Sequence, residues 1–279
     1  MAETKEQTER LTYLLNQLIV DSGVYDTIEL PEEYEEKRRA VRSLMNVRMP
    51  GRISEEVLKV QDEFLKSEAL EKGIVTLKDI PAVEKQYGSK HPFAGKLSIW
   101  QGDITRLEVG AIVNAANSQM LGCFVPCHRC IDNAIHSAAG MQLREECNHV
   151  MNQKRIRYGR NYEEPVGSAV ITKGYNLPAE YVIHTVGPIV GYRLNDSLRR
   201  DLRNCYRSVL ECAAEHKIKS VAFCCISTGE FHFPNQEAAS IAVETVTAFL
   251  KENPDHFDRI IFNVFKDMDR RLYEERLVL

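Results

Sequence analysis

The sequence predicts an α/β fold in which helices cover both sides of a sheet, preceded by a small helical region. Three observations support this. From Lys96 onward, short β-type runs alternate with helical patterns. Continuous apolar strands such as SVAFCCI (220–226) indicate burial on both faces of the sheet. The first 90 residues instead carry amphipathic helical patterns with few β-type alternations.

The predicted strands of the sheet are short and rich in β-branched or other apolar residues. They cover residues 96–100, 111–115, 167–173, 181–186, 220–226 and 259–265. Helical patterns lie between them at roughly 132–151, 196–215 and 235–252. Ligands in such folds bind beyond the carboxyl ends of the strands, so the loops at those ends are the first candidates for a site.

The N-terminal region, residues 1–90, is expected to form three or more helices. Apolar residues recur at helical spacing from Leu11, a charged stretch follows Pro31, and a third pattern begins after Ser54, a typical N-cap residue. The charge-rich faces of these helices are typical of solvated surface, so we assign them no chemistry. Residues 91–279 are expected to form the second domain.

Composition limits the possible classes of protein. The chain has 279 residues, 44% hydrophobic and 27% charged, which is typical of soluble globular proteins. A net charge of -4 gives no basic footprint, so we expect no nucleic-acid partner. A polar start and the lack of an 18-residue apolar run predict neither signal peptide nor membrane span. Eight cysteines in such a chain do not indicate a disulfide framework, and we expect a reducing cytoplasmic location.

Three cysteines and a histidine crowd into one loop of eight residues: Cys123, Cys127, His128 and Cys130. Thiolate and imidazole ligands suit Zn²⁺. Ligation by Cys123, His128 and Cys130 would leave a fourth position open for water or substrate, whereas adding Cys127 would close the site. Because adjacent residues rarely both reach one metal in a tight loop, we favour the three-ligand site.

Two other interpretations of this loop stay open. Cys127 and Cys130 form a C-x-x-C pair after Pro126, so they could be a redox couple that cycles through a disulfide. The cysteines could also be small buried hydrophobes. Attachment of a c-type haem is excluded, because Ile131 rather than histidine follows Cys130.

Polar and small residues follow several strand ends. Asn114 and Asn117 close one predicted strand, and Ser227-Thr228-Gly229 follows another. Small residues there let backbone N–H groups approach a phosphate, although an ordinary turn explains them equally well. Asp132 lies near a helix start, where it could be the N-cap, a general base, or both. His136, one turn later, could pack inward or support a metal ligand from behind.

Taken in order, these motifs resemble the macrodomain family. The matching segments are Gly102-Asp103-Ile104-Thr105, IVNAAN (112–117), the Asp132-x-x-Ile-His helix start, VIHTVGP (182–188) and ISTGEFHFP (226–234), and the match spans residues 96–279. Many macrodomains carry a run of glycines where this chain has its cysteine loop. That replacement, together with the N-terminal helices, resembles the zinc-dependent subfamily of protein-ADP-ribose hydrolases. Cys127 is not expected within that pattern. The resemblance implies a three-layer α/β/α fold with a mixed central sheet.

The resemblance also implies a ligand, ADP-ribose, lying across the top of the sheet. Asp103 would accept a hydrogen bond from the adenine amino group beside the Ile104 backbone, and Phe265 would stack on the adenine. The residues that would wrap the diphosphate through backbone amides are Ser227, Thr228, Gly229, Glu230 and Phe231. Asn117 would bind the distal ribose hydroxyls, while Asn114 could equally be structural.

The function implied is removal of mono-ADP-ribose from modified proteins, at the ester bond to an acidic side chain. One zinc ion per chain, held by Cys123, His128 and Cys130, would lie against the distal ribose, with Asp132 and Asn117 as the catalytic residues. The alternative is a module that binds ADP-ribose without cutting it and holds a structural zinc.

Overall fold

The computed structural model describes residues 4–23 and 30–278. A six-stranded sheet forms its centre, in the order β2-β8-β7-β4-β6-β5. The strands are β2 Leu97–Gln101, β8 Arg259–Val264, β7 Ser220–Phe223, β4 Ala111–Ala116, β6 Tyr181–Val186 and β5 Ala169–Lys173. Neighbours pair in parallel except β5, which is antiparallel to β6. The sheet is therefore mixed, as predicted.

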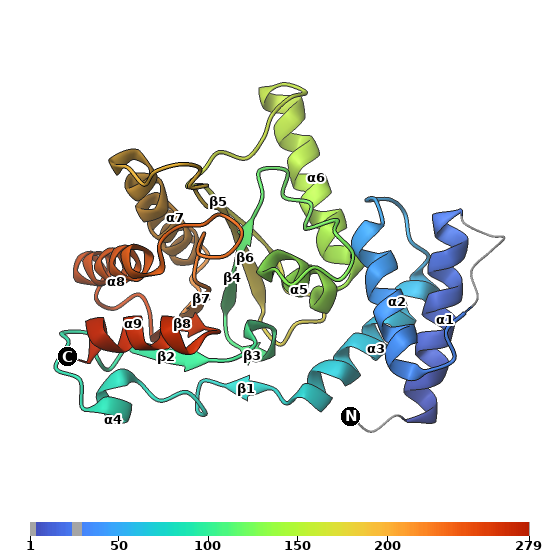
Figure 1. The fold of residues 1–279 in the computed structure, drawn as a ribbon, viewed down its shortest axis with the longest axis horizontal. Helices are drawn as coiled ribbons and strands as arrows, with labels where there is room; N and C mark the ends of the chain where they lie inside the picture. Colours follow the sequence, from blue (N-terminus) through green and yellow to red (C-terminus); the bar gives the residue numbers. More distant parts are fainter. Residues whose placement is uncertain (1–3, 24–29, 279) are drawn as a thin grey trace.

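Helices cover both faces of this sheet (Figure 1). On one side α7 (Asp196–Glu215), α8 (Asn235–Glu252) and α9 (Asp267–Leu277) pack in sequence, α7 on α8 and α8 on α9. On the other side α5 (Ile131–Ala139) contacts β4, and α6 (Met141–Tyr158) contacts β5. The three-layer α/β/α prediction is confirmed, and the parallel strands bring their carboxyl ends to one edge.

The predicted helix at 132–151 is wrong, because the structure has two helices there. They separate at Gly140, whose φ of 95° and ψ of 177° belong to a region that essentially only glycine adopts. A Cβ at this position would lie 2.6 Å from Gln61 Nε2 and 2.9 Å from Asn176 Nδ2. The break lets α5 and α6 turn against the N-terminal helices.

Three predicted strands are longer than the observed ones, since β7 ends at Phe223, β8 ends at Val264 and β5 begins at Ala169. The sequence patterns also missed several short elements and the last helix, α9. The short elements are β1 (Val75–Thr76), α4 (Val83–Tyr87), the 3-10 turn η1 (Ile104–Arg106) and β3 (Leu107–Glu108), and β1 pairs with β3 in parallel.

The described part of residues 1–90 forms α1 (Lys5–Ser22), α2 (Tyr34–Val47) and α3 (Glu55–Lys72), followed by the short α4, which confirms the prediction of three or more helices. Ser54 is confirmed as an N-cap, because its side chain accepts a hydrogen bond from the Val57 N–H at 3.2 Å. The apolar stripes of the three helices meet in a cluster that also includes Met141 of α6. Figure 1 shows the three helices beside α5 and α6, so they lie next to the helical layer that these two helices form on one face of the sheet.

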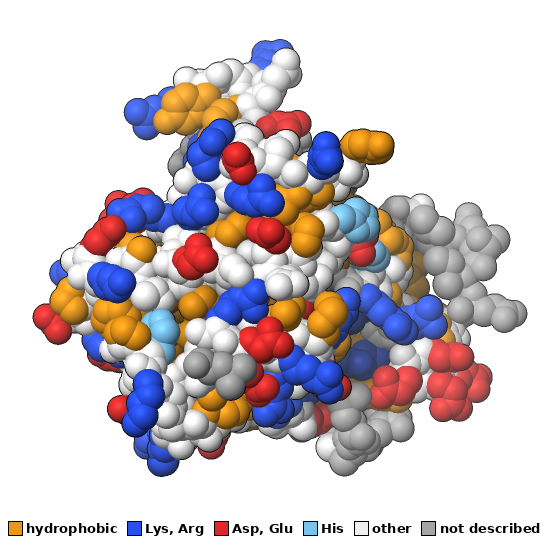
Figure 2. Space-filling model, turned by 60° about the vertical axis from the view of Figure 1, so that its left-hand side comes forward, with side chains coloured by type: hydrophobic (Ala, Val, Ile, Leu, Met, Phe, Trp, Pro, Cys, Tyr) orange, Lys and Arg blue, Asp and Glu red, His pale blue; other side chains and the backbone are white. Residues whose placement is uncertain are grey.

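Charged side chains of both signs are interspersed over the face shown in Figure 2. Among the helices of residues 4–23 and 30–278, none is long and apolar enough to cross a membrane.

Replacing Gly140 by alanine should destabilise the protein more than replacing Gly159, which follows α6. Both glycines have backbone angles that suit glycine alone, so each change costs about 1–3 kcal/mol of backbone strain. Only Gly140 also faces close neighbours, while a Cβ on Gly159 meets nothing within 4 Å. Chemical denaturation of Gly140→Ala and Gly159→Ala measures the difference, and equal losses would contradict the close approach of α3 to Gly140.

Candidate active site

The loops at the carboxyl edge of the sheet gather most of the residues selected from the sequence. β4 runs into Asn117, and β7 leads into the segment that contains Ser227. β8 ends just before Phe265, and β2 just before Asp103. Because these four strands are parallel neighbours, their ends lie side by side. The long loop between β4 and α5 carries the cysteines to this edge.

The Asp132 carboxylate lies buried where β4 meets α5. The Asn114 side chain donates to Asp132 Oδ1 at 2.8 Å, and the Asn117 side chain donates to Oδ2 at 3.5 Å. Burial raises the pKa of Asp132 to about 6, and the hydrogen bond from Asn114 opposes that rise. Asp132 is not the helix N-cap; the Cys130 sulfur takes that place by accepting from the Asn133 N–H at 3.4 Å. The carboxylate therefore faces the two asparagines.

A buried series of side-chain hydrogen bonds holds Asn114 in place. Its amide nitrogen also donates to His184 Nδ1 at 3.0 Å, and His184 Nε2 lies 2.9 Å from Thr172 Oγ1. Since Asn114 supplies the hydrogen, His184 Nδ1 accepts and Nε2 carries the proton. Burial lowers the pKa of His184 to about 3, which keeps the ring neutral. The Asn114 amide nitrogen thus donates to both His184 and Asp132, and the bond to His184 helps to orient the one to Asp132.

Three potential metal ligands come together in the cysteine loop: Cys123, His128 and Cys130. Their ligand atoms all lie within 4.8 Å of one another, with Cys123 Sγ 3.6 Å from His128 Nδ1. Two thiols and an imidazole at this spacing fit a zinc ion. On its far side the His128 ring has Nε2 3.8 Å from Glu230 Oε1, the kind of carboxylate that orients a ligand histidine. Glu230, selected for the diphosphate loop, therefore also borders the candidate metal site.

Cys127 lies outside this trio. Its thiol points toward α2, with Sγ 3.5 Å from the Arg39 carbonyl oxygen, and its N–H donates to Asn46 Oδ1 at 2.9 Å. This geometry gives Cys127 a different direction from Cys130, whose thiol faces Cys123. It favours the three-ligand arrangement over the C-x-x-C pair.

A second group of possible ligands, His136, Cys147 and His184, is fully buried behind Asp132. Both ring nitrogens of His184 already have hydrogen-bond partners. Burial lowers the pKa of His136, and the nearby positive Arg144 guanidinium lowers it further. We therefore regard this group as polar core. The His136 ring also packs closely against the start of the cysteine loop. A Cβ on Gly122 would lie only 2.8 Å from this ring.

The loop after β7 is a tight, closed turn. Ser227 is buried with φ 64°, and its carbonyl oxygen accepts from the Phe233 N–H at 2.9 Å. Thr228 bonds back to the Cys225 carbonyl oxygen through its hydroxyl at 2.9 Å. Gly229 at the tip is exposed and meets nothing within 4 Å where a Cβ would stand. The Phe231 carbonyl oxygen accepts from the Val190 N–H, which joins this loop to the one after β6.

The two residues expected at the adenine end differ in their surroundings. The Asp103 carboxylate accepts from the Thr105 N–H at 3.0 Å and its hydroxyl at 2.7 Å, so it does form the turn before η1. The Ile104 side chain is buried in the core, which leaves only its backbone for a ligand. Phe265 is 75% exposed just beyond β8. An aromatic ring left in solvent at a strand end is available for stacking.

Comparison with known proteins identifies the family of this chain. The Macro domain family model matches residues 113–242. A protein of Treponema medium named protein-ADP-ribose hydrolase is 45% identical over 269 residues, covering 96% of this chain and 98% of that protein. Another of the same name, from Staphylococcus aureus (strain MSSA476), is 43% identical over 276 residues, 99% of this chain and 97% of its own. The chain belongs to the protein-ADP-ribose hydrolase family.

Solved structures place this protein-ADP-ribose hydrolase among the macrodomains. The Trypanosoma brucei macrodomain in complex with ADP-ribose superposes with a TM-score of 0.62 at 30% identity, covering 84% of this chain and 94% of that one. The fold and family expected from the motifs are confirmed. The enzyme class is also confirmed, which favours a hydrolase over a module that only binds or a redox protein.

Zinc content should separate the cysteines of the loop. Cys123→Ala and Cys130→Ala should lose the metal, because each removes one of three ligands, whereas Cys127→Ala should keep it, because that thiol faces Arg39. Elemental analysis after purification and dialysis measures this. Loss of zinc from Cys127→Ala would contradict the three-ligand site.

Proposed function

We propose that this chain is a zinc-dependent hydrolase that removes mono-ADP-ribose from modified proteins by cutting the ester bond to an acidic side chain. One observation carries the proposal: the buried Asp132 carboxylate, the Cys123–His128–Cys130 trio and the loop after β7 converge on one edge of the sheet. The Treponema and Staphylococcus relatives, named protein-ADP-ribose hydrolase, support the hydrolase part of the proposal.

The chain's own groups would hold the substrate along that edge. The exposed Phe265 ring would stack on adenine, with the Asp103 carboxylate beside it. Backbone N–H groups of the Ser227–Phe231 loop would take the diphosphate, for which positive side chains are not required. The amide of Asn117, already 3.5 Å from Asp132, would meet the distal ribose hydroxyls. This order would bring the scissile end of ADP-ribose against the cysteine loop.

Asp132 is the group proposed to move a proton. Asn114 fixes Oδ1 at 2.8 Å, whereas Oδ2, with the longer 3.5 Å contact from Asn117, would face a water molecule next to the distal ribose. Cys123, His128 and Cys130 would hold the zinc, which would act there as a Lewis acid and lower the pKa of bound water. Glu230 would orient His128 from the far side. The proposed setting is the cytoplasm, where thiol ligands stay reduced.

Asp132→Asn should lower kcat by roughly 10²-fold or more, because it removes the proton-accepting oxygen while keeping the side chain's size. Its affinity for ADP-ribose should stay within about threefold of wild type, since the diphosphate and adenine contacts are unchanged. Release of ADP-ribose from proteins modified on glutamate or on serine, with calorimetry for binding, measures both the rate and the preferred linkage.

The same assay tests the metal and the alternative function. A chelator should abolish release from the glutamate-linked substrate, and added zinc should restore it. Tight binding of ADP-ribose by the zinc-loaded wild type with no release from either substrate would contradict the hydrolase and favour a binding module.

Phe265→Ala should weaken ADP-ribose binding by about tenfold, since stacking of one base on an aromatic ring contributes about 1–3 kcal/mol. The ring is 75% exposed, so the free energy of unfolding should hardly change. Tyr158→Ala, at another exposed aromatic on the end of α6, is the matched control and should bind normally. Unchanged affinity in Phe265→Ala would remove Phe265 from the adenine site.

A further inference from the structure

The N-terminal helix α2 contacts the cysteine loop directly. Asn46 Oδ1 accepts from the Cys127 N–H at 2.9 Å, and the Arg39 carbonyl oxygen lies 3.5 Å from Cys127 Sγ. The Arg42 guanidinium donates to Asn133 Oδ1 at 2.8 Å, in the first turn of α5. A region to which the sequence assigned no chemistry thus reaches both the loop and the helix that follows it.

Cys127 needs such support because its backbone is in the left-handed region, at φ 51°. This conformation is unfavourable for a residue with a Cβ. The turn it makes has two consequences, since the Cys127 thiol points outward to α2 while His128, the next residue, brings Nδ1 to 3.6 Å from Cys123 Sγ. At this turn the Cys127 thiol is directed away from Cys123 and the His128 ring toward it.

Asn46 is built to hold this turn. It is 1% exposed, and its amide group is used at both ends, since Oδ1 accepts from Cys127 and Nδ2 donates to Ser137 Oγ at 3.0 Å on α5. The Cys127 N–H accounts for one end only, so the two contacts can be removed separately. Asn114 and Asp132, which belong to the proposed chemistry, make no part of this contact.

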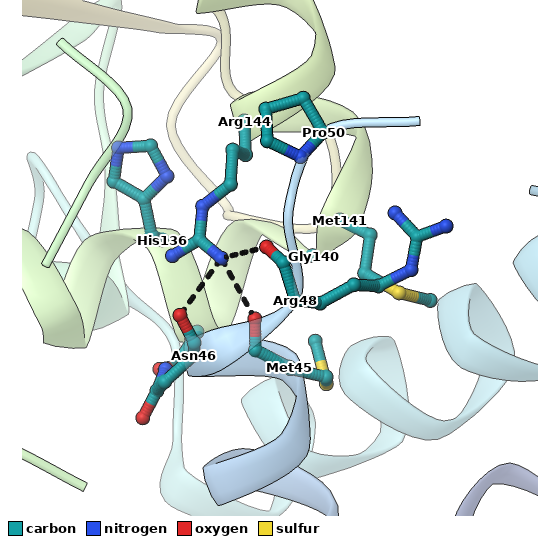
Figure 3. Close-up of a pocket in the computed structure, with 9 residues that line it drawn as sticks. Met45, Asn46, Arg48, Pro50, His136, Gly140, Met141 and Arg144 are labelled. Carbon is teal, nitrogen blue, oxygen red and sulfur yellow. Dashed lines mark hydrogen bonds between the residues drawn. The ribbon is translucent and has the colours of Figure 1, made fainter. Parts of the chain in front are cut away.

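The end of α2 is itself held by Arg144 of α6 (Figure 3). One guanidinium nitrogen, Nη1, donates to the carbonyl oxygens of Met45, Asn46 and Arg48, at 2.9, 2.9 and 2.6 Å. The same guanidinium uses Nε to donate to the Leu121 carbonyl oxygen at 2.7 Å, just before the ligand loop. Arg144 therefore connects the segment just before the cysteine loop to the last turn of α2.

We propose that Asn46 is a positioning residue for the metal site: by binding the Cys127 N–H, it holds the left-handed turn that directs Cys127 away from the ion and His128 toward it. The helical region would then complete the active site rather than only cover α5 and α6. This inference rests on the proposed zinc ligation by Cys123, His128 and Cys130.

Transfer of zinc to a chromogenic chelator tests the proposal. Asn46→Ala should release zinc about tenfold faster than wild type, as expected for the loss of one buried hydrogen bond that supports the site. Asn46→Asp keeps the acceptor for the Cys127 N–H and should stay within about threefold of wild type. Ser137→Ala removes the other partner of Asn46, together with the 3.3 Å bond from Ser137 Oγ to Asn133 Oδ1, and should release zinc at the wild-type rate. An unchanged rate in Asn46→Ala would overturn the proposal.

A double variant separates positioning from a general loss of structure. Glycine adopts the left-handed conformation without strain, so Cys127→Gly should keep zinc and should return the release rate of Asn46→Ala to within about threefold of wild type. If Asn46 served only to stabilise the N-terminal helices, Cys127→Gly would not rescue it, and a double variant as fast as Asn46→Ala would count against the proposal.

Hydrogen exchange of the metal-free protein distinguishes failure of this inference from failure of the zinc site. A wild type that binds no zinc would overturn the ligand assignment, and exchange at the Cys127 amide would then decide the role of Asn46. If the Cys127 amide loses its protection in Asn46→Ala and retains it in Ser137→Ala, the result would support the role of Asn46 in holding the turn. Equal protection in wild type and both variants would overturn it.

Discussion

Burial of the Asp132 carboxylate is the constraint on which the rest of the site depends. A carboxylate removed from water is costly unless hydrogen-bond donors surround it, and here Asn114 and Asn117 supply them. Those two side chains are available only because β4 ends where it does, in register with β6 and β7. Asn114 in turn is fixed by His184 on β6, whose ring is bonded to Thr172 of β5. The position of one charge is thus specified across three strands.

The cysteine loop depends on a second set of contacts, which come from both the α/β layers and the N-terminal helices. Its start is tied by the Asn117 side chain, which donates to the Gly122 carbonyl oxygen, and by Arg144, which donates to that of Leu121. Its middle is tied to Asn46 of α2. The N-terminal helices and the α/β layers therefore both supply contacts that hold the loop of the candidate metal site. This arrangement gives the helical region a physical reason to accompany this macrodomain.

Local sequence patterns were sufficient to predict most of the fold. All six strands of the sheet and the helices α7 and α8 follow from apolar periodicity, because each buries a continuous apolar face. The helix break at Gly140 did not follow, since a single glycine in an Ala-Ala-Gly run gives a weak signal unless the approach of Gln61 is known. Asp132 as an N-cap was wrong for a similar reason, because a cysteine rather than a typical capping residue occupies that place. The short strands β1 and β3 carry too few residues for a pattern.

The candidate site was only partly predictable. Spacing alone selected Cys123, His128 and Cys130, and the ordered motifs added Asn117, Asp132 and the loop after β7. Asn46, Arg144 and His184 were missed as contributors, because they lie far along the chain from their partners and look like ordinary helix or strand residues. The 81 positions between Asn46 and Cys127 carry no local sign of the contact. Such residues become visible only once the tertiary structure brings them to the loop.

The most direct test of the central claim is a crystal structure of zinc-loaded Asp132→Asn with ADP-ribose bound. The account predicts an ion ligated by Cys123, His128 and Cys130, with its open position facing the distal ribose and residue 132 beside it. An ion closed by Cys127 as fourth ligand, or a distal ribose lying away from the cysteine loop, would contradict it.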